Sequence, residues 1–183
     1  MKRSLILALA ASSLAMSCPA MAQDVKTASI AVVNIQQVMR DSTAAKSVRE
    51  QLESKQKSFQ SEITKKEEAL QKEDQELGKQ KSVLSKEAFE KKATEFRKKA
   101  AEVQKEVQTK KALLDSGFER ALNDIQKSVN DIIAEMAKEK SFQLAVPTSQ
   151  ILYADDKMDI SKDVLERLNK KLPKVDVKFE AKK

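Results

Sequence analysis

The sequence predicts a mainly α-helical protein in which a long antiparallel helical hairpin is inserted between the strands of a small β body. Three observations lead to this fold class. Two long stretches carry apolar residues at helical spacing, a short break separates these stretches, and β-branched runs stand near both ends of the chain. Two paired rods anchored by the terminal segments are the simplest structure with this pattern.

Residues 1–22 predict a secretory signal peptide with cleavage before Gln23. Lys2 and Arg3 precede an apolar run, and small residues stand at the cleavage position. Lipoprotein processing at Cys18 is the alternative, although the leucine-like residue expected three positions before a lipidated cysteine is missing. Cleavage before Gln23 removes 22 residues and two basic groups, which leaves 161 residues, a net charge of +5 and no cysteine. We therefore expect an exported protein without disulfides.

The composition of the mature chain predicts an oligomer with anionic partners. Only seven aromatic residues serve the protein, whereas 34% of all residues are charged. A monomer with this composition would have a thin core, so association is the expected source of stability. An excess of basic residues often indicates nucleic acid, but an exported protein rarely meets any. Acidic proteins and anionic lipid surfaces are therefore the expected partners, and nucleic acid is not.

The mature chain opens with a body segment, residues 23–40, which contains a β-branched strand over residues 29–35. A helix is predicted from about Asp41 to Lys81. Its apolar stripe consists of large residues spaced for one helical face, namely Val48, Leu52, Phe59, Ile63, Leu70 and Leu77. Gly78 weakens the end of this helix.

The second helix is predicted from Ser85 to Glu139, a stretch without proline. In its apolar stripe, 47 residues separate Phe89 from Met136 in 13 steps, or about 3.6 residues per step, the period of a straight α-helix. Ser85 is a suitable N-cap, and Glu87 lies in the first turn, where the helix dipole favours a carboxylate. Residues 41–140 thus form a nearly straight hairpin with its turn near residues 79–85.

The two stripes match when the helices run antiparallel. With a turn centred near Val83, paired residue numbers sum to about 166, which places Ile63 opposite Val103 and Val48 opposite Phe118. A parallel dimer of continuous rods does not require this symmetry, so the hairpin is preferred. The same rule produces one polar layer, made by Lys55, Gln56, Lys110 and Lys111. This layer is either a solvated interruption or, at Lys55, Lys110 and Lys111, a bending point of the arms.

Residues 141–173 are predicted to complete the body. Residues 142–146 and 151–154 read as strands, with Pro147 between them, and Ser161 is expected to cap a short helix that ends before Pro173. The basic tail, residues 174–183, alternates apolar and polar side chains. It is either an edge strand or disordered.

The residues that usually carry chemistry are scarce. The chain contains no histidine, and its two glycines do not form a phosphate-binding loop. Carboxylates are numerous, but they alternate with lysines on polar helix faces, where solvation explains them. The sequence therefore predicts no catalytic, metal or cofactor site and does not support an enzyme.

The region around the turn is strongly basic. Residues 79–99 contain only three carboxylates but eight basic groups. The basic groups are Lys79, Lys81, Lys86, Lys91, Lys92, Arg97, Lys98 and Lys99. These charges either keep the helices soluble or attract acidic proteins and lipid headgroups. The seam uses most large apolar residues, so Leu113 is the main apolar side chain of the arms left for a partner, together with the two at the turn.

Several of these features together resemble the Skp family of periplasmic outer-membrane-protein chaperones, also called OmpH-like. They are the signal peptide, the Ile30-Ala31-Val32-Val33-Asn34 strand, the charged hairpin turning at Val83-Leu84-Ser85, the strand at residues 142–146, and the run from Asp159 to Leu165. The resemblance covers the mature chain except the basic tail. It implies a periplasmic homotrimer with a β-rich body and three helical arms that enclose unfolded β-barrel proteins. The resemblance also suggests that the basic residues of the arms bind lipopolysaccharide.

The sequence thus leads to a hypothesis of an ATP-independent holdase without cofactors. Its basic arms would capture unfolded outer-membrane proteins through many weak contacts and release them as they fold. The alternative is a structural coiled-coil spacer or adaptor of the cell envelope. The insertion of the hairpin between strands favours the chaperone, because a spacer does not need it.

Overall fold

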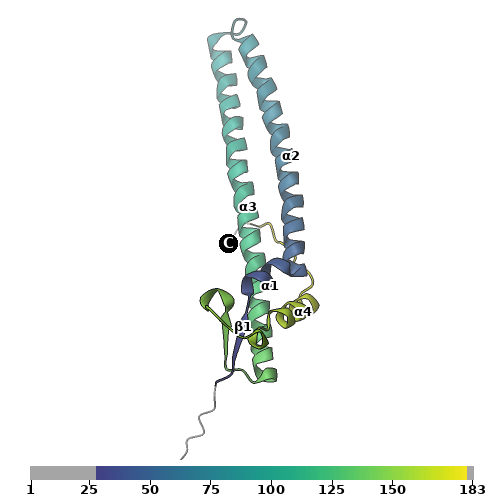
Figure 1. Cartoon of the computed structure of the whole chain (residues 1–183). Helices are drawn as coiled ribbons and strands as arrows, with labels where there is room; N and C mark the ends of the chain where they lie inside the picture. The colour runs from purple at the N-terminus through teal and green to yellow at the C-terminus, as the bar shows by residue number, and fades with distance from the viewer. Residues whose placement is uncertain (1–27, 181–183) are drawn as a thin grey trace, which may run out of the picture.

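The computed structural model describes residues 28–180, and it contains a small body from which two paired helices project (Figure 1). The body begins with strand β1 (Ile30–Val33) and helix α1 (Ile35–Asp41). The arms are α2 (Thr43–Gln80) and α3 (Lys86–Lys140). The chain then returns to the body through β2 (Leu144–Pro147), two short 3₁₀ helices and α4 (Ser161–Lys171). The predicted fold class, a helical hairpin inserted between strands, is confirmed.

The two strands form a parallel sheet although 110 residues separate them. Ile30 pairs with Leu144, and Val33 pairs with Pro147. Parallel neighbours need a crossover connection, and here the whole hairpin is that connection. The segment before α4 adds a single bridge, between Val32 and Asp159. β1 is therefore hydrogen-bonded to β2 and also to the segment that leads into α4.

The start of the first arm differs from the prediction. Ile35 was assigned to the strand, but it begins α1, a separate seven-residue helix. Asn34 caps α1 by accepting a hydrogen bond from the Gln37 amide at 2.9 Å. Ser42 then interrupts the helix and caps α2, because its buried hydroxyl accepts from the Ala45 amide at 3.2 Å. A capping serine thus marks the junction between body and arm.

The second arm follows the prediction closely. Ser85 is the N-cap of α3, and its hydroxyl accepts from the Ala88 amide at 3.3 Å. The helix contains 55 residues and ends at Lys140, and its C-cap Ser141 has a φ of 58°, in the left-handed region. Residues 81–84 form the turn between the arms.

Two predictions for the C-terminal body are wrong. Residues 151–154 do not form a strand, and the exposed Leu152 and Tyr153 lie in a loop instead. Ser161 is the first residue of α4, not its cap, and its buried hydroxyl accepts a hydrogen bond from the Asn34 amide at 2.7 Å. A tertiary contact to the end of β1 thus takes the serine that the sequence pattern assigned to a cap.

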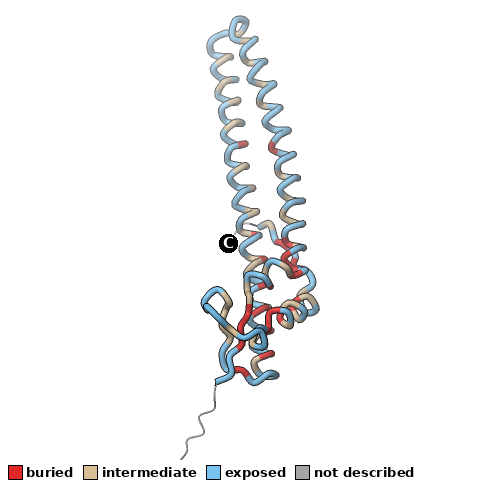
Figure 2. The backbone as a smooth tube through the Cα atoms, viewed as in Figure 1, coloured by how far each residue is buried: buried red, intermediate tan, exposed pale blue. Residues whose placement is uncertain are grey.

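The hydrophobic core lies in the body and at the base of the arms (Figure 2). It combines the lower half of α3 with residues from every other part of the body. The side chains of Val38, Ile125, Ile132, Met136, Val164 and Leu168 are fully buried. The predicted signal peptide and the predicted cleavage before Gln23 lie outside the described residues.

Candidate functional site

The arms pack against each other through a narrow seam. Beyond the base, Ile63 and Val103 are the most buried apolar residues of α2 and α3, each 8% exposed, as expected for two residues predicted to lie in the seam. Their neighbours along the stripe, such as Leu70 and Phe96, are half-buried. Two helices can cover only one side of each other, so the remaining sides of the arms stay in solvent.

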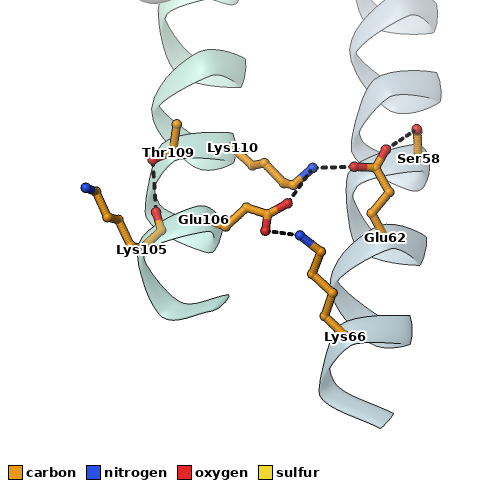
Figure 3. A network of polar contacts seen from close by, with 7 residues as sticks. All are labelled: Ser58, Glu62, Lys66, Lys105, Glu106, Thr109 and Lys110. Atoms are coloured by element: carbon orange, nitrogen blue, oxygen red, sulfur yellow. Dashed lines mark hydrogen bonds and ion pairs between the residues drawn. The ribbon is translucent and has the colours of Figure 1, made fainter. Parts of the chain in front are cut away.

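Ion pairs between the arms flank this seam (Figure 3). Lys110 reaches from α3 to Glu62 on α2 and also contacts Glu106 one turn away, while Lys66 pairs with Glu106. The hydrogen bond from Lys110 is the main reason why the pKa of Glu62 lies below its ordinary value, and the bond from Lys66 does the same for the pKa of Glu106. Nearer the turn, Lys99 pairs with Glu73 at 2.7 Å.

The predicted polar layer has a different structure from the one expected. Lys110 is only 13% exposed at its side chain, and its ammonium lies 4.3 Å from the centre of the Phe59 ring. Lys55 lies 4.7 Å from the same ring. Two lysines therefore cover an aromatic face, which provides favourable cation–π contacts. A role of Lys55, Lys110 and Lys111 as a bending point stays a prediction.

An apolar groove opens between the arms beside this layer. Its volume is about 540 Å³, and we call it the inter-arm groove. Leu52, Phe59, Ile63, Val107, Leu114 and Phe118 form its apolar lining, and Lys110, Lys111 and Asp115 are among its polar residues. Phe118 is 41% exposed, although the predicted seam placed it against Val48. Part of the apolar stripe is therefore accessible.

The basic residues predicted near the turn lie on the exposed ends of the arms. Several have polar neighbours: Lys79 pairs with Glu76 at 2.8 Å, and Lys92 donates to Gln80 at 2.6 Å. By contrast, Lys81, Lys86, Lys91 and Lys98 are exposed and form no ion pair with any residue of the described range. Leu113 lies lower on α3 and is half-buried. The basic residues thus do not share one surface with Leu113.

The basic tail is the feature that the sequence left undecided. Residues 174–180 are extended but belong to no sheet, and Val175 and Val177 are buried against the base of the hairpin. Gln51 and Arg120 bind its backbone. The alternation of apolar residues in the tail was a signal for an extended buried segment, but nothing in the sequence indicated its partner.

The described residues hold no group of three or more histidine, cysteine, aspartate or glutamate side chains arranged to bind a metal ion. Within the same range, none of the helices combines the length and the apolar character needed to cross a membrane.

The family model for outer membrane proteins of the OmpH-like type matches residues 29–168. The chain belongs to the OmpH-like family. The match includes the hairpin, both strands and most of α4, so the body and the arms of this OmpH-like chain are family features. It ends before the tail. Comparison with curated protein sequences gave no match.

A solved structure supports the fold of this OmpH-like chain. It is the crystal structure of a protein from Caulobacter crescentus CB15 that its authors describe as an outer membrane chaperone (OmpH-like) on a provisional basis. The TM-score is 0.76 at 19% sequence identity, and the match covers 82% of this chain and 89% of the other. The two chains thus share their architecture despite low identity.

Proposed function

We propose that this protein is an ATP-independent holdase chaperone of the periplasm that binds unfolded outer-membrane β-barrel proteins and prevents their aggregation. The observation that carries the proposal is the accessible inter-arm groove, a surface of aliphatic and aromatic side chains with lysines around it. Unfolded chains expose apolar side chains of varied sequence, and a groove of this type binds them without specific polar readout. Membership of the OmpH-like family supports the same role.

The proposal includes a homotrimer and export. In a trimer, three bodies would associate and three pairs of arms would surround a shared space, so that many weak contacts add up. The body offers exposed apolar side chains for such association, including Leu144, Leu152 and Tyr153. Export would follow cleavage before Gln23.

The unpaired lysines near the turn have a separate role in this proposal. Lys81, Lys86, Lys91 and Lys98 project into solvent far from the body and attract acidic segments of clients or anionic lipid and lipopolysaccharide surfaces. Such contacts between exposed charges accelerate encounter and weaken as salt rises.

The central test is an aggregation assay with a denatured outer-membrane β-barrel protein diluted into buffer. The mature protein should suppress light scattering at a small molar excess, and multi-angle light scattering should give the mass of a trimer. A stable monomer, or full aggregation at large excess, would contradict the proposal and favour a structural spacer.

The role of the lysines is tested by matched variants. Changing Lys81, Lys86, Lys91 and Lys98 to glutamine should slow client binding at low salt and reduce its salt dependence. Changing four exposed lysines of the body and the base of α3 to glutamine, namely Lys138, Lys157, Lys162 and Lys170, removes the same charge and should have little effect. Equal effects of the two sets would show that only the net charge matters.

A further inference from the structure

The tail after Pro173 crosses the base of the hairpin and lies outside the residues that the family model matches. In Figure 1 it leaves α4, passes the lower end of α2 and reaches α3. Val175 and Val177 are 7% and 8% exposed, and Phe179 is half-buried. Alternate residues of the tail thus face the arms, as in a strand that covers an apolar surface.

Two arm residues bind the backbone of the tail. The Gln51 side chain accepts a hydrogen bond from the Val177 amide at 3.0 Å and donates one to the Val175 carbonyl at 2.7 Å. The Arg120 guanidinium donates to the carbonyls of Lys178 at 2.8 Å and Glu180 at 2.6 Å. None of these bonds uses a side chain of the tail, so the contacts fit an extended chain of any sequence, as strand addition to a sheet edge does.

The space beneath the tail depends on Gly117 of α3. A Cβ atom at this position would lie 3.0 Å from Val177 Cγ1 and 3.2 Å from the Lys178 carbonyl oxygen. Glycine therefore lets the tail approach the helix closely, although it weakens a helix interior. Gln51, Gly117 and Arg120 together form a site for an extended chain, which we call the tail seat.

The tail seat continues into the inter-arm groove. Phe179 lies next to the groove, because the Lys55 ammonium is 5.8 Å from its ring centre and 4.7 Å from that of Phe59. The groove beyond Phe59 remains open in the described structure.

We propose that the tail seat and the inter-arm groove form one binding site for an extended polypeptide segment with apolar side chains at alternate positions, and that the protein's own tail competes for it. This choice of ligand rests on the proposed function, since apolar and polar side chains alternate along the strands of membrane β-barrels. A client segment displaces the tail from the seat and also fills the groove, whose lining includes none of residues 174–180. The additional apolar contacts offset the high local concentration of the attached tail.

A reversible lock of the tail tests this competition in the full mature chain. In the double variant Gly117→Cys/Val177→Cys, the sulfur of residue 177 takes the place of Val177 Cγ1, which would lie 3.0 Å from a Cβ atom at residue 117. The two cysteine side chains are therefore in contact and can be joined by a disulfide, which relieves the clash that a side chain at residue 117 makes with Val177. Oxidation should weaken binding of a denatured outer-membrane protein at least tenfold, and reduction should restore it. The single variant Val177→Cys, treated with the same oxidant after its thiol has been blocked by alkylation, controls for oxidation itself. Unchanged or tighter binding by the oxidised double variant would overturn the proposal.

A second measurement does not depend on a natural client. The probe is a fluorescent peptide of residues 173–183, and the acceptor is the full chain with Val177→Ser and Phe179→Ser, which loosen the attached tail. Fluorescence anisotropy should show binding, and a peptide of the same composition without the alternation should bind at least tenfold more weakly. Equal binding of the two peptides would contradict the inference.

The two assays separate this inference from the proposed function. Peptide binding without aggregation suppression would leave the site valid and refute the chaperone role. Aggregation suppression that is insensitive to the tail lock would leave the chaperone role valid and refute the site. The tail would then be only a strap that holds the two arms together.

Discussion

The lower and upper halves of α3 lie on one helix but are packed very differently. In the lower half, Ile125, Val129, Ile132 and Met136 are at most 1% exposed. In the upper half, Val103 is the only buried residue above Gly117, at 8%. The lower half shares one hydrophobic core with β1, α1 and α4, whereas the upper half packs against α2. The same apolar spacing therefore builds a core in one place and an accessible surface in the other.

This difference separates stability from binding. The body holds the well-packed contacts, which contribute most of the free energy of folding. The arms keep apolar residues half-exposed and rely on ion pairs that water screens. A chain that must present apolar surface without collapsing needs such a division, because accessible apolar groups add little to its own stability.

The largest expected effect compares one isoleucine from each region. Ile132→Ala removes a fully buried side chain from the body and should lower the free energy of unfolding by about 3–5 kcal/mol. Ile63→Ala in the seam should cost about half as much or less, because water reaches the site and the arms can close on the gap. Urea denaturation at one fixed protomer concentration measures both. Equal costs would show that the arms are packed as well as the body.

The next effect compares two serines that receive backbone hydrogen bonds. Ser161→Ala leaves the part-buried Asn34 amide without its partner and should cost about 1–3 kcal/mol. Ser85→Ala removes an exposed cap at the turn and should cost about 0.5–1 kcal/mol. Thermal unfolding followed by circular dichroism gives both values. A larger cost at Ser85 would mean that the turn, not the body, limits stability.

The two glycines should respond in opposite directions to the same substitution. A Cβ atom added at Gly78 would have no neighbouring atom within 4 Å, so Gly78→Ala should stabilise the end of α2 by about 0.5–1 kcal/mol. Slower hydrogen exchange in that helix would report the gain. Gly117→Ala places a methyl group against Val177 and should loosen the tail. Faster tryptic cleavage after Lys174 or Lys178, with Gly78→Ala as the control, is the expected result. Unchanged cleavage would mean that the helix shifts to make room.

The smallest expected effect is a loss of folding stability at low pH. The pKa of Glu106 lies below its ordinary value of 4.5, mainly because of its hydrogen bond from Lys66. A carboxyl with a lowered pKa stabilises the folded state above its ordinary pKa, and this contribution is lost as the pH falls through the lowered value. The difference in melting temperature between the wild type and Glu106→Gln should therefore shrink below pH 4.5. Glu67→Gln, at an exposed position of α2, is the matched control, and a constant difference for Glu106→Gln would exclude the ion pair as its cause.

Much of the hairpin could be predicted because helical period and capping are local properties. The apolar stripe, the cap at Ser85 and the burial of Ile63 and Val103 all follow from spacing along one chain. The body was harder to predict, since its short elements depend on distant partners. Ser161 faces Asn34 across 127 positions, and no local pattern distinguishes that contact from a helix cap.

The candidate site was predicted only in part. The lysines of the polar layer were identified, but the sequence did not show that Lys55 and Lys110 cover Phe59 or that a groove opens beside them. Phe118 was assigned to the seam because its spacing fits a straight pairing of the arms. Its exposure depends on how far apart the two helices stand, which spacing along the chain does not determine.

The sequence by itself determined two long antiparallel helices, their turn and their basic ends, because these features depend on the helical period and on charge along each helix. The tertiary structure alone decided where the tail lies and where the apolar stripe stays open. Gly117, Gln51 and Arg120 come from different arms and meet the tail only after the chain has folded. Contacts of this kind depend on the distance between elements in space, and the pattern of residues along the sequence does not determine that distance.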